Sequence, residues 1–310
     1  MLRFLKRCLV GSPLETKSLP EQRLSKKAAL PILASDNLSS SAYATEEIVV
    51  GLLAGASAGI LFPLYYAIPI ALAIGGLTAI VAISYGQTLY AYPTGGGAYT
   101  VAKENLGATP ALVAGSALLV DYVLTVAVSV AAGVAAITSA FPALYEHRVA
   151  LAVATILFIL VANLRGVRES AAVFAGPVYL FIGCAFLLIA GGLWQYYAGG
   201  RLPPPPAAPS PAWTYASVFL LLHAFASGCA ALTGIEAVAN GVTLFQSPVS
   251  RNAAAVLYTL AALLTAMFLG ITVLTYLYGI HPQEGQTMLS QLARAVFGTG
   301  PLYYTIQAAT

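Results

Sequence analysis

The feature that most constrains this chain is a series of long apolar runs that contain very few charged residues. Only 8% of the 310 residues are acidic or basic and 59% are apolar, whereas about 25% of a typical soluble domain is charged. Runs of about twenty apolar residues indicate transmembrane helices, because a helix of that length crosses the hydrocarbon core of a bilayer. The chain is therefore predicted to be an all-α polytopic membrane protein.

Polar breaks between the apolar runs predict seven spans and the start of an eighth. The spans are expected at 29–54, 62–90, 108–140, 148–165, 172–198, 214–245 and 252–280. The eighth begins near Pro301 and would be about ten residues long, against roughly 20 needed to cross. We interpret the chain as a fragment of about seven and a half spans, with an amphipathic helix at Met288 to Phe297 before the last one.

The basic residues predict the orientation, since short cytoplasmic loops carry an excess of lysine and arginine. Seven of the 14 basic residues lie in the first 27 positions. Four more fall on the same side and three on the other: Lys103, Arg165, Arg168 and Arg251 against Arg148, Arg201 and Arg294. A multi-pass protein of the plasma (bacterial inner) membrane with a cytoplasmic N-terminus is expected, and the positive charge needs no nucleic-acid partner.

A proline-rich stretch divides the predicted spans into two groups. Prolines cannot continue a helix, and six of them lie within 203–211. Residues 41–46 can be laid over 231–236, which predicts an inverted repeat. The expected organisation is a basic cytoplasmic segment at 1–28, a five-helix repeat at 29–199, an external linker at 200–213, and the first part of a second repeat at 214–310.

The most informative residues are acids inside the predicted spans: Asp36, Glu46, Glu47, Asp121 and Glu236. A charge near the bilayer centre costs about 2.5 to 3.5 kcal/mol on insertion scales. No lysine or arginine lies in the same spans to neutralise them. Their burial therefore indicates a cation, a proton or a water-filled cavity. Glu46 and Glu47 have a simpler alternative, a position near a helix end in water.

Small polar residues surround these acids. The stretch 36–43 is rich in serine, whose hydroxyl competes for backbone hydrogen bonds, so it is expected to unwind and line a cavity. Asp121, Thr125 and Ser129 recur every four residues and share a helix face. Their oxygens suit a hard cation, although the two hydroxyls could instead bond back to their own helix.

Other signals in the chain argue against an enzyme. Residues 55–59 match the G-x-S-x-G pattern of hydrolases, but they end an apolar helix instead of following a strand. The glycines at 95–97 are followed by no G-K-[ST], so they form no phosphate-binding loop and are expected in a tight re-entrant turn. Three separated cysteines predict neither a disulfide framework nor a zinc site. No cofactor is expected beyond the transported ions.

Several of these segments resemble the amino acid, polyamine and organocation (APC) superfamily. Within it the chain is similar to KUP-type potassium/proton symporters and to the bacterial KimA-like potassium importers. The resemblance covers nearly the whole chain and is most specific at 35–46, 92–107, 119–129, 163–166 and 227–236.

The resemblance implies a LeuT-like fold of two inverted five-helix repeats in which the first and sixth helices are broken. It also implies that the potassium pathway is lined by Asp36, Tyr43, Asp121, Thr125, Ser129, Thr233 and Glu236, with Ser40, Glu46 and Tyr122 as further candidates. Glu236 would be the proton-coupling acid. The family's C-terminal region, absent here, would form a homodimer.

These observations lead to one functional hypothesis and two alternatives. The chain is expected to belong to a secondary active transporter that imports potassium by alternating access, with proton symport. An amino-acid or polyamine permease is the second interpretation, although Asp36 would repel a substrate carboxylate. A membrane scaffold that senses a cation without moving it is the third.

Overall fold

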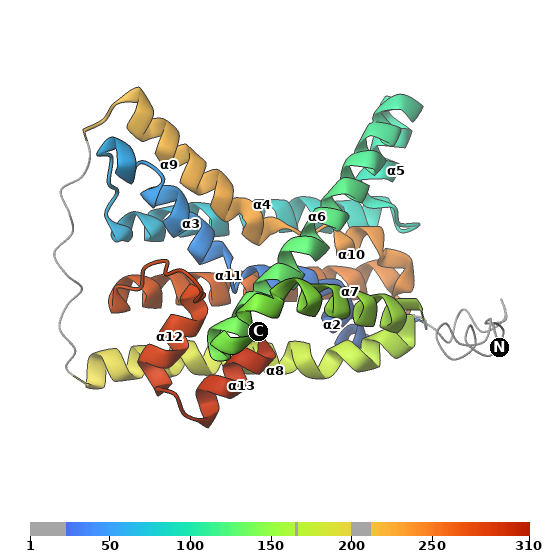
Figure 1. The fold of residues 1–310 in the computed structure, drawn as a ribbon. Helices are drawn as coiled ribbons and strands as arrows, with labels where there is room; N and C mark the ends of the chain where they lie inside the picture. The colour runs from blue at the N-terminus through green and yellow to red at the C-terminus, as the bar shows by residue number, and fades with distance from the viewer. Residues whose placement is uncertain (1–22, 165–166, 200–211) are drawn as a thin grey trace.

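The computed structural model describes residues 23–164, 167–199 and 212–310, and helices form nearly all of its regular structure (Figure 1). The predicted cytoplasmic segment lies mostly outside these residues, and so does most of the predicted external linker. Six helical segments are long and apolar enough to cross a membrane within the described ranges. The protein is therefore a multi-pass, all-α membrane protein.

The helices follow the predicted spans closely. Before residue 200 the helices are α2 (Lys26–Ser40), α3 (Ala44–Leu53), α4 (Ala67–Ala91), α5 (Gly97–Leu106), α6 (Ala108–Ala140), α7 (Arg148–Leu164) and α8 (Val167–Ala198). After residue 211 they are α9 (Tyr215–Gly228), α10 (Ala237–Asn240), α11 (Val249–Tyr278), α12 (Met288–Phe297) and α13 (Pro301–Ala309). Short 3₁₀ turns join several of them: η2 (Ala56–Ala58), η3 (Leu64–Tyr66), η4 (Pro142–His147), η5 (Cys229–Leu232) and η6 (Val242–Leu244). The amphipathic helix expected at Met288 to Phe297 is confirmed as α12.

Two of the predicted spans are interrupted, as expected for the first and sixth helices. The first span is divided into α2 and α3 by a turn at Ser41–Tyr43. The sixth is divided into α9 and α10 by η5 and the segment Thr233–Glu236. In Figure 1, α3 lies beside α9, and the two helices are in extensive contact.

The predicted unwinding of the whole stretch 36–43 is wrong for its first five residues. Residues 36–40 remain helical in α2. The hydroxyls of Ser39 and Ser40 donate to the carbonyl of Asp36, and that of Ser41 donates to Leu38. These bonds run back along the same helix, so they satisfy the hydroxyls without displacing the backbone ladder. Only the turn that follows departs from α-helical geometry.

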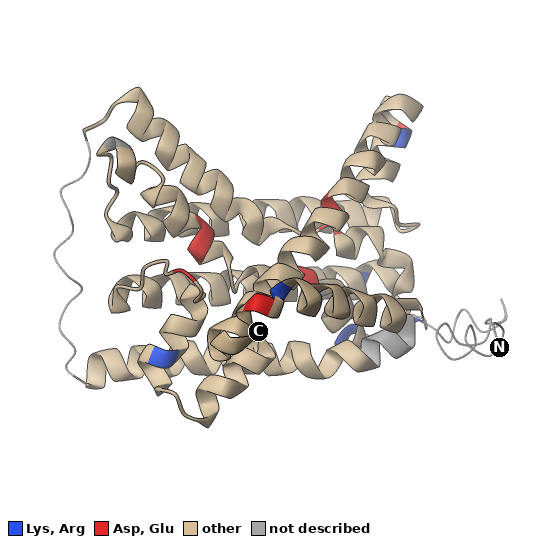
Figure 2. Ribbon diagram, viewed as in Figure 1, with Lys and Arg blue, Asp and Glu red and all other residues tan. Residues whose placement is uncertain are grey.

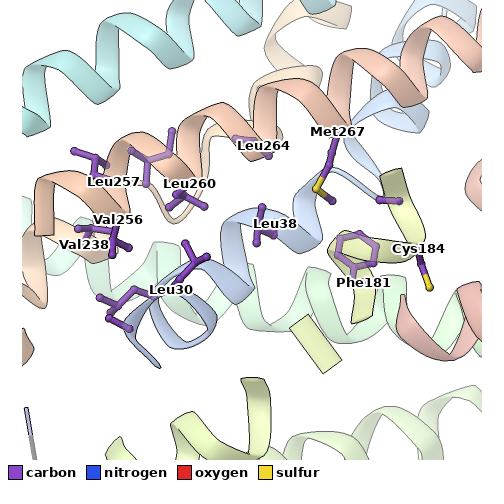
Figure 3. Packing of buried hydrophobic residues seen from close by; sticks show 14 of the residues in the cluster. Leu30, Leu38, Phe181, Cys184, Val238, Val256, Leu257, Leu260, Leu264 and Met267 are labelled. Atoms are coloured by element: carbon purple, nitrogen blue, oxygen red, sulfur yellow. The ribbon is translucent and has the colours of Figure 1, made fainter. Parts of the chain in front are cut away.

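A continuous apolar cluster holds the two interrupted spans against the unbroken ones. It contains buried residues from α2, α8, α10 and α11, and Figure 3 shows Leu38, Phe181 and Leu264 among the side chains that meet there. Leu257 and Leu260 are fully buried in the same cluster. A second cluster joins α3 and α4 to α9. The broken helices are therefore supported by packing on both sides of their breaks.

Charged positions are sparse along the ribbon, and some acidic ones lie within the helical body instead of in the loops (Figure 2). Residues 55–59 form a 3₁₀ turn after α3, with no strand before them. This is not the strand-to-helix elbow that a hydrolase nucleophile requires.

Candidate functional site

The candidate site lies where the broken sixth span crosses α2. Asn37 of α2 is fully buried and donates from Nδ2 to the carbonyl of Thr233 at 2.7 Å and to that of Ala231 at 3.4 Å. The Ala231 carbonyl belongs to η5 and the Thr233 carbonyl to the segment between η5 and α10, where the chain leaves the α-helical path. Such carbonyls need donors from elsewhere in the protein, because water is scarce at this depth.

Hydroxyl groups join the two breaks directly. The Ser40 hydroxyl lies 3.0 Å from the Tyr43 hydroxyl and 3.1 Å from that of Thr233. The Thr233 hydroxyl also donates to the carbonyl of Ala230 at 2.9 Å. Three of the predicted site residues are therefore brought together, although Ser40 was only a secondary candidate.

Gly234 lets the sixth span approach the carboxylate of Asp36. Its φ is +85°, a conformation that residues with a side chain rarely adopt. A Cβ at this position would lie 2.8 Å from Oδ2 of Asp36 and 3.1 Å from the backbone nitrogen of Asn37. The glycine is thus required both by the turn and by the close approach of the two elements.

Asp36 also borders a cavity of about 370 Å³ between α2, α6, α7 and α8. Its polar lining is provided mainly by hydroxyl, amide and carboxylate groups, and one contact crosses between helices: the Ser39 and Ser129 hydroxyls lie 3.3 Å apart. The complete lining is Ile32, Ser35, Asp36, Ser39, Tyr122, Val126, Ser129, Val130, Ile159, Asn163 and Phe174.

Asp36, at this cavity, is repelled by two other acids that do not line it. Asp36, Asp121 and Glu236 each interact unfavourably with the other two when ionised. Glu236 is 9% exposed, and its Oε1 is buried without a hydrogen-bond partner. Among the residues that the structure describes, no lysine or arginine contributes a favourable charge to Asp36 or Glu236. An arrangement of this kind favours a bound cation or a proton.

The three residues predicted to share a face of α6 do not all reach the cavity. Ser129 borders it, and Thr125 is 7% exposed within the helix packing. Asp121 borders a separate groove lined by other residues of α6. A four-residue period drifts around a straight helix, because four residues exceed one turn by about 40°. Along α6 from Ser129 to Asp121, this face therefore turns away from the cavity.

The amide of Asn240 on α10 donates to the hydroxyl of Tyr122 on α6. The turn at 92–96 packs against the same residue, since the Gly96 nitrogen donates to the Asn240 carbonyl at 3.5 Å. A Cβ on Gly97 would collide with the Asn240 side chain. The glycine turn is thus a packing partner of α10.

Glu46 lies in a different environment from the other predicted acids. Its Oε2 accepts from the backbone nitrogen of Met288 at 3.0 Å, at the first turn of α12. The neighbouring Thr287 nitrogen donates to the hydroxyl of Ser139. A carboxylate at a helix N-terminus is stabilised by the helix dipole. Glu46 is therefore satisfied structurally and does not join the cavity.

Sequence reasoning missed Ser35, Asn37 and Ser39, which the structure places at the cavity or at the crossing of the broken spans. Each adjoins or lies close to Asp36, and the polar density of that stretch was the available signal. In the described ranges, no three histidine, cysteine or acidic side chains converge as a metal chelate. A cation here would be held by mixed hydroxyl, carbonyl and carboxylate oxygens.

Comparison with known proteins agrees with this architecture. The family model described as Amino acid permease matches residues 37–304, which is most of the chain. The chain belongs to the amino acid permease family. The match takes in the breaks of both interrupted helices and most of the residues that line the cavity, but it begins after Asp36.

One curated relative of this permease is the "Potassium transporter KimA" of Bacillus subtilis (strain 168). The two are 48% identical over 312 residues, which cover 100% of this chain and 51% of the relative. The chain thus spans about half the length of the relative it matches. The relative's name states what that protein transports, and the resemblance to potassium importers inferred from the sequence is confirmed.

Proposed function

We propose that this permease imports potassium ions by alternating access and couples their movement to protons. The observation that carries the proposal is Asp36, which borders the cavity and is repelled by Asp121 and Glu236 when these acids are ionised. Ionised acids in such a place are stabilised by a cation. The similarity to a potassium transporter supports potassium as that cation.

The ion would be held by oxygens from both interrupted helices. The hydroxyls of Tyr43 and Thr233 meet at Ser40, and Asp36 lies against Gly234. A dehydrated potassium ion requires several such oxygens in place of its water. Because the ligands belong to elements that end or turn at the site, small rotations of the half-helices would open it to one face or the other.

Glu236 is the candidate for proton coupling. Its Oε1 is buried without a hydrogen-bond partner among the described residues, so the side chain is sensitive to whether a cation or a proton neutralises it. If the potassium ion and the proton neutralise this region in turn, potassium binding is linked to protonation. Each of them would bias the same equilibrium between the two access states. No enzymatic step is part of this proposal.

The test is uptake of rubidium, a potassium analogue, by the full-length protein in proteoliposomes with and without an inward proton gradient. Asp36→Asn and Glu236→Gln are compared with wild type, and Glu47→Gln is the control because Glu47 is exposed. Gradient-stimulated uptake that both site variants lose supports the proposal. Wild-type uptake that does not depend on the proton gradient would contradict the proton-coupling part of the proposal. Absence of rubidium uptake by the wild type would contradict the proposal as a whole.

An organic amine is the second candidate substrate. The cavity of about 370 Å³ is far larger than a potassium ion, and the family is that of amino acid permeases. A polyamine would satisfy the same acids with ammonium groups. Radiolabelled putrescine added to the same vesicles distinguishes the two: uptake of putrescine without rubidium transport favours the amine.

We also place the protein in the plasma membrane with its N-terminus in the cytoplasm. Lys26 begins α2 and Arg251 lies in the first turn of α11. The two helices are linked nearby by the bond from the Leu24 nitrogen to the Leu244 carbonyl. Basic groups at these neighbouring ends are consistent with one cytoplasmic face. Labelling of single cysteines placed in the loops of intact cells tests this orientation.

A further inference from the structure

Asn37, at the crossing of the broken spans, holds two backbone carbonyls at once. It lies in α2, three residues before Ser40, and no part of it is exposed. Its Nδ2 donates to the carbonyls of Thr233 and Ala231, which lie almost two hundred positions later in the chain. The bond to Thr233, at 2.7 Å, is the shorter of the two.

The surroundings determine which way the amide points. Two carbonyl oxygens can accept only from a donor, so the NH₂ end must face them. The Oδ1 end is then left buried without a hydrogen-bond partner. A buried unpaired oxygen destabilises a fold, and leucine, whose side chain has the same branching, would avoid this cost. The presence of an asparagine is therefore explained by what its NH₂ group holds.

The two carbonyls belong to the segment in which the sixth span is not α-helical. Thr233 has extended backbone angles, and Gly234 follows it with φ of +85°. Neither carbonyl is part of an α-helical ladder. Without the amide, the buried Ala231 carbonyl and the half-buried Thr233 carbonyl would both lose this donor, which would favour closing of the segment into a helix or its movement toward water.

We infer that Asn37 is a positioning residue that holds the sixth span open and sets the place of Thr233 in the substrate site. This inference rests on the proposed transport function. The Thr233 hydroxyl meets Ser40, and the adjacent Gly234 faces Asp36. Since these contacts follow from the position of one short segment, loss of the Asn37 amide weakens substrate binding without removing any predicted ligand.

The first experiment tests whether Asn37 holds the sixth span in place, without any transport assay. Amide hydrogen exchange of residues 229–236 is followed in purified full-length wild type, Asn37→Ala and Asn37→Leu. The leucine variant keeps the branching and the number of non-hydrogen atoms of the side chain, and the alanine variant removes them, so a change shared by both reports loss of the donor instead of a cavity. Exchange in this segment is expected to quicken at least about fivefold in both, as loss of one or two hydrogen bonds implies.

The matched control is Ser41→Ala. Ser41 is also fully buried in this part of the first span, but its hydroxyl donates only to Leu38 in the same segment. Its removal leaves the sixth span untouched. Exchange of 229–236 in this variant is expected to equal that of wild type. Unchanged exchange in both Asn37 variants would overturn the inference, and so would equal acceleration in Ser41→Ala.

The second experiment separates affinity from turnover. Rubidium uptake is measured against concentration for the same four proteins in proteoliposomes. The Asn37 variants are expected to raise KM about tenfold, with a maximal rate per folded molecule close to that of wild type. A general folding defect would instead lower the maximal rate and leave KM unchanged. That result in the Asn37 variants would contradict the inference. If wild type carries no rubidium, the transport proposal fails. The exchange measurement still decides whether Asn37 holds the sixth span in place.

Discussion

The two interrupted helices differ in how far the chain departs from the helical path. In the first, the nitrogens of Ser41, Ala42 and Tyr43 donate to carbonyls three residues earlier, so the turn tightens but still satisfies its own backbone. In the second, Thr233 is extended and Gly234 is left-handed. Two of the carbonyls there accept from Asn37 of the other helix.

The comparison shows that similar interruptions are maintained by different means. The first is self-sufficient, because serine hydroxyls and three-residue bonds satisfy it locally. The second depends on partners that come from the first. Substitutions at the second break should therefore have larger effects than those at the first, and substitutions beyond either break should have the smallest.

The largest effect is expected from Gly234→Ala. A left-handed backbone costs about 1 to 2 kcal/mol for a residue with a Cβ, and the new methyl would also press on the Asp36 carboxylate. Rubidium uptake in proteoliposomes is expected to fall at least about tenfold, in line with that strain. Uptake by Gly234→Ala at the wild-type level would show that the second break tolerates movement. The difference proposed between the two breaks would then be wrong.

Gly76→Ala is the control for this substitution. Gly76 lies inside α4, and a Cβ there would meet no atom within 4 Å. The change is expected to stabilise the helix by about 0.5 to 1 kcal/mol. Uptake should not change.

An intermediate effect is expected from Ser40→Ala at the first break. The change removes the hydroxyl that meets Tyr43 and Thr233, but it leaves the local backbone bonds in place. Each lost bond is worth about 0.5 to 1.5 kcal/mol, so KM for rubidium should rise about threefold to tenfold. Thr78→Ala, which removes a buried hydroxyl that bonds only within α4, should leave KM unchanged. A larger loss in Ser40→Ala than in Gly234→Ala would reverse the ranking of the two breaks.

The smallest effect is expected from Glu46→Gln, beyond the first break. The amide oxygen can still accept from the Met288 nitrogen, so only the charge at the start of α12 is lost. Such charges are worth about 0.3 to 1 kcal/mol, which a small drop in melting temperature would report. Rubidium uptake should remain near that of wild type. Abolished uptake would place Glu46 in the ion pathway, contrary to its contact with α12.

Much of the fold could be predicted from sequence, because apolar runs and their polar breaks are local patterns. Helix α12 was predicted to the residue, and both interruptions were located. The extent of the first was overestimated, since the sequence does not show whether a serine hydroxyl replaces a backbone bond or adds to one. The cavity was predicted only in part: Ser129 and Asp36 border it, while Glu46 bonds to a helix that lies 242 residues further along the chain.

The sequence by itself determined that the chain spans a membrane, roughly where its long helices lie, and which acids lie in apolar runs without a basic residue. These properties follow from composition and period within about twenty residues. Only the tertiary structure decided which oxygens meet. The contact between Asn37 and Thr233 joins positions 196 residues apart, and such a contact depends on how whole helices pack, which no local pattern records.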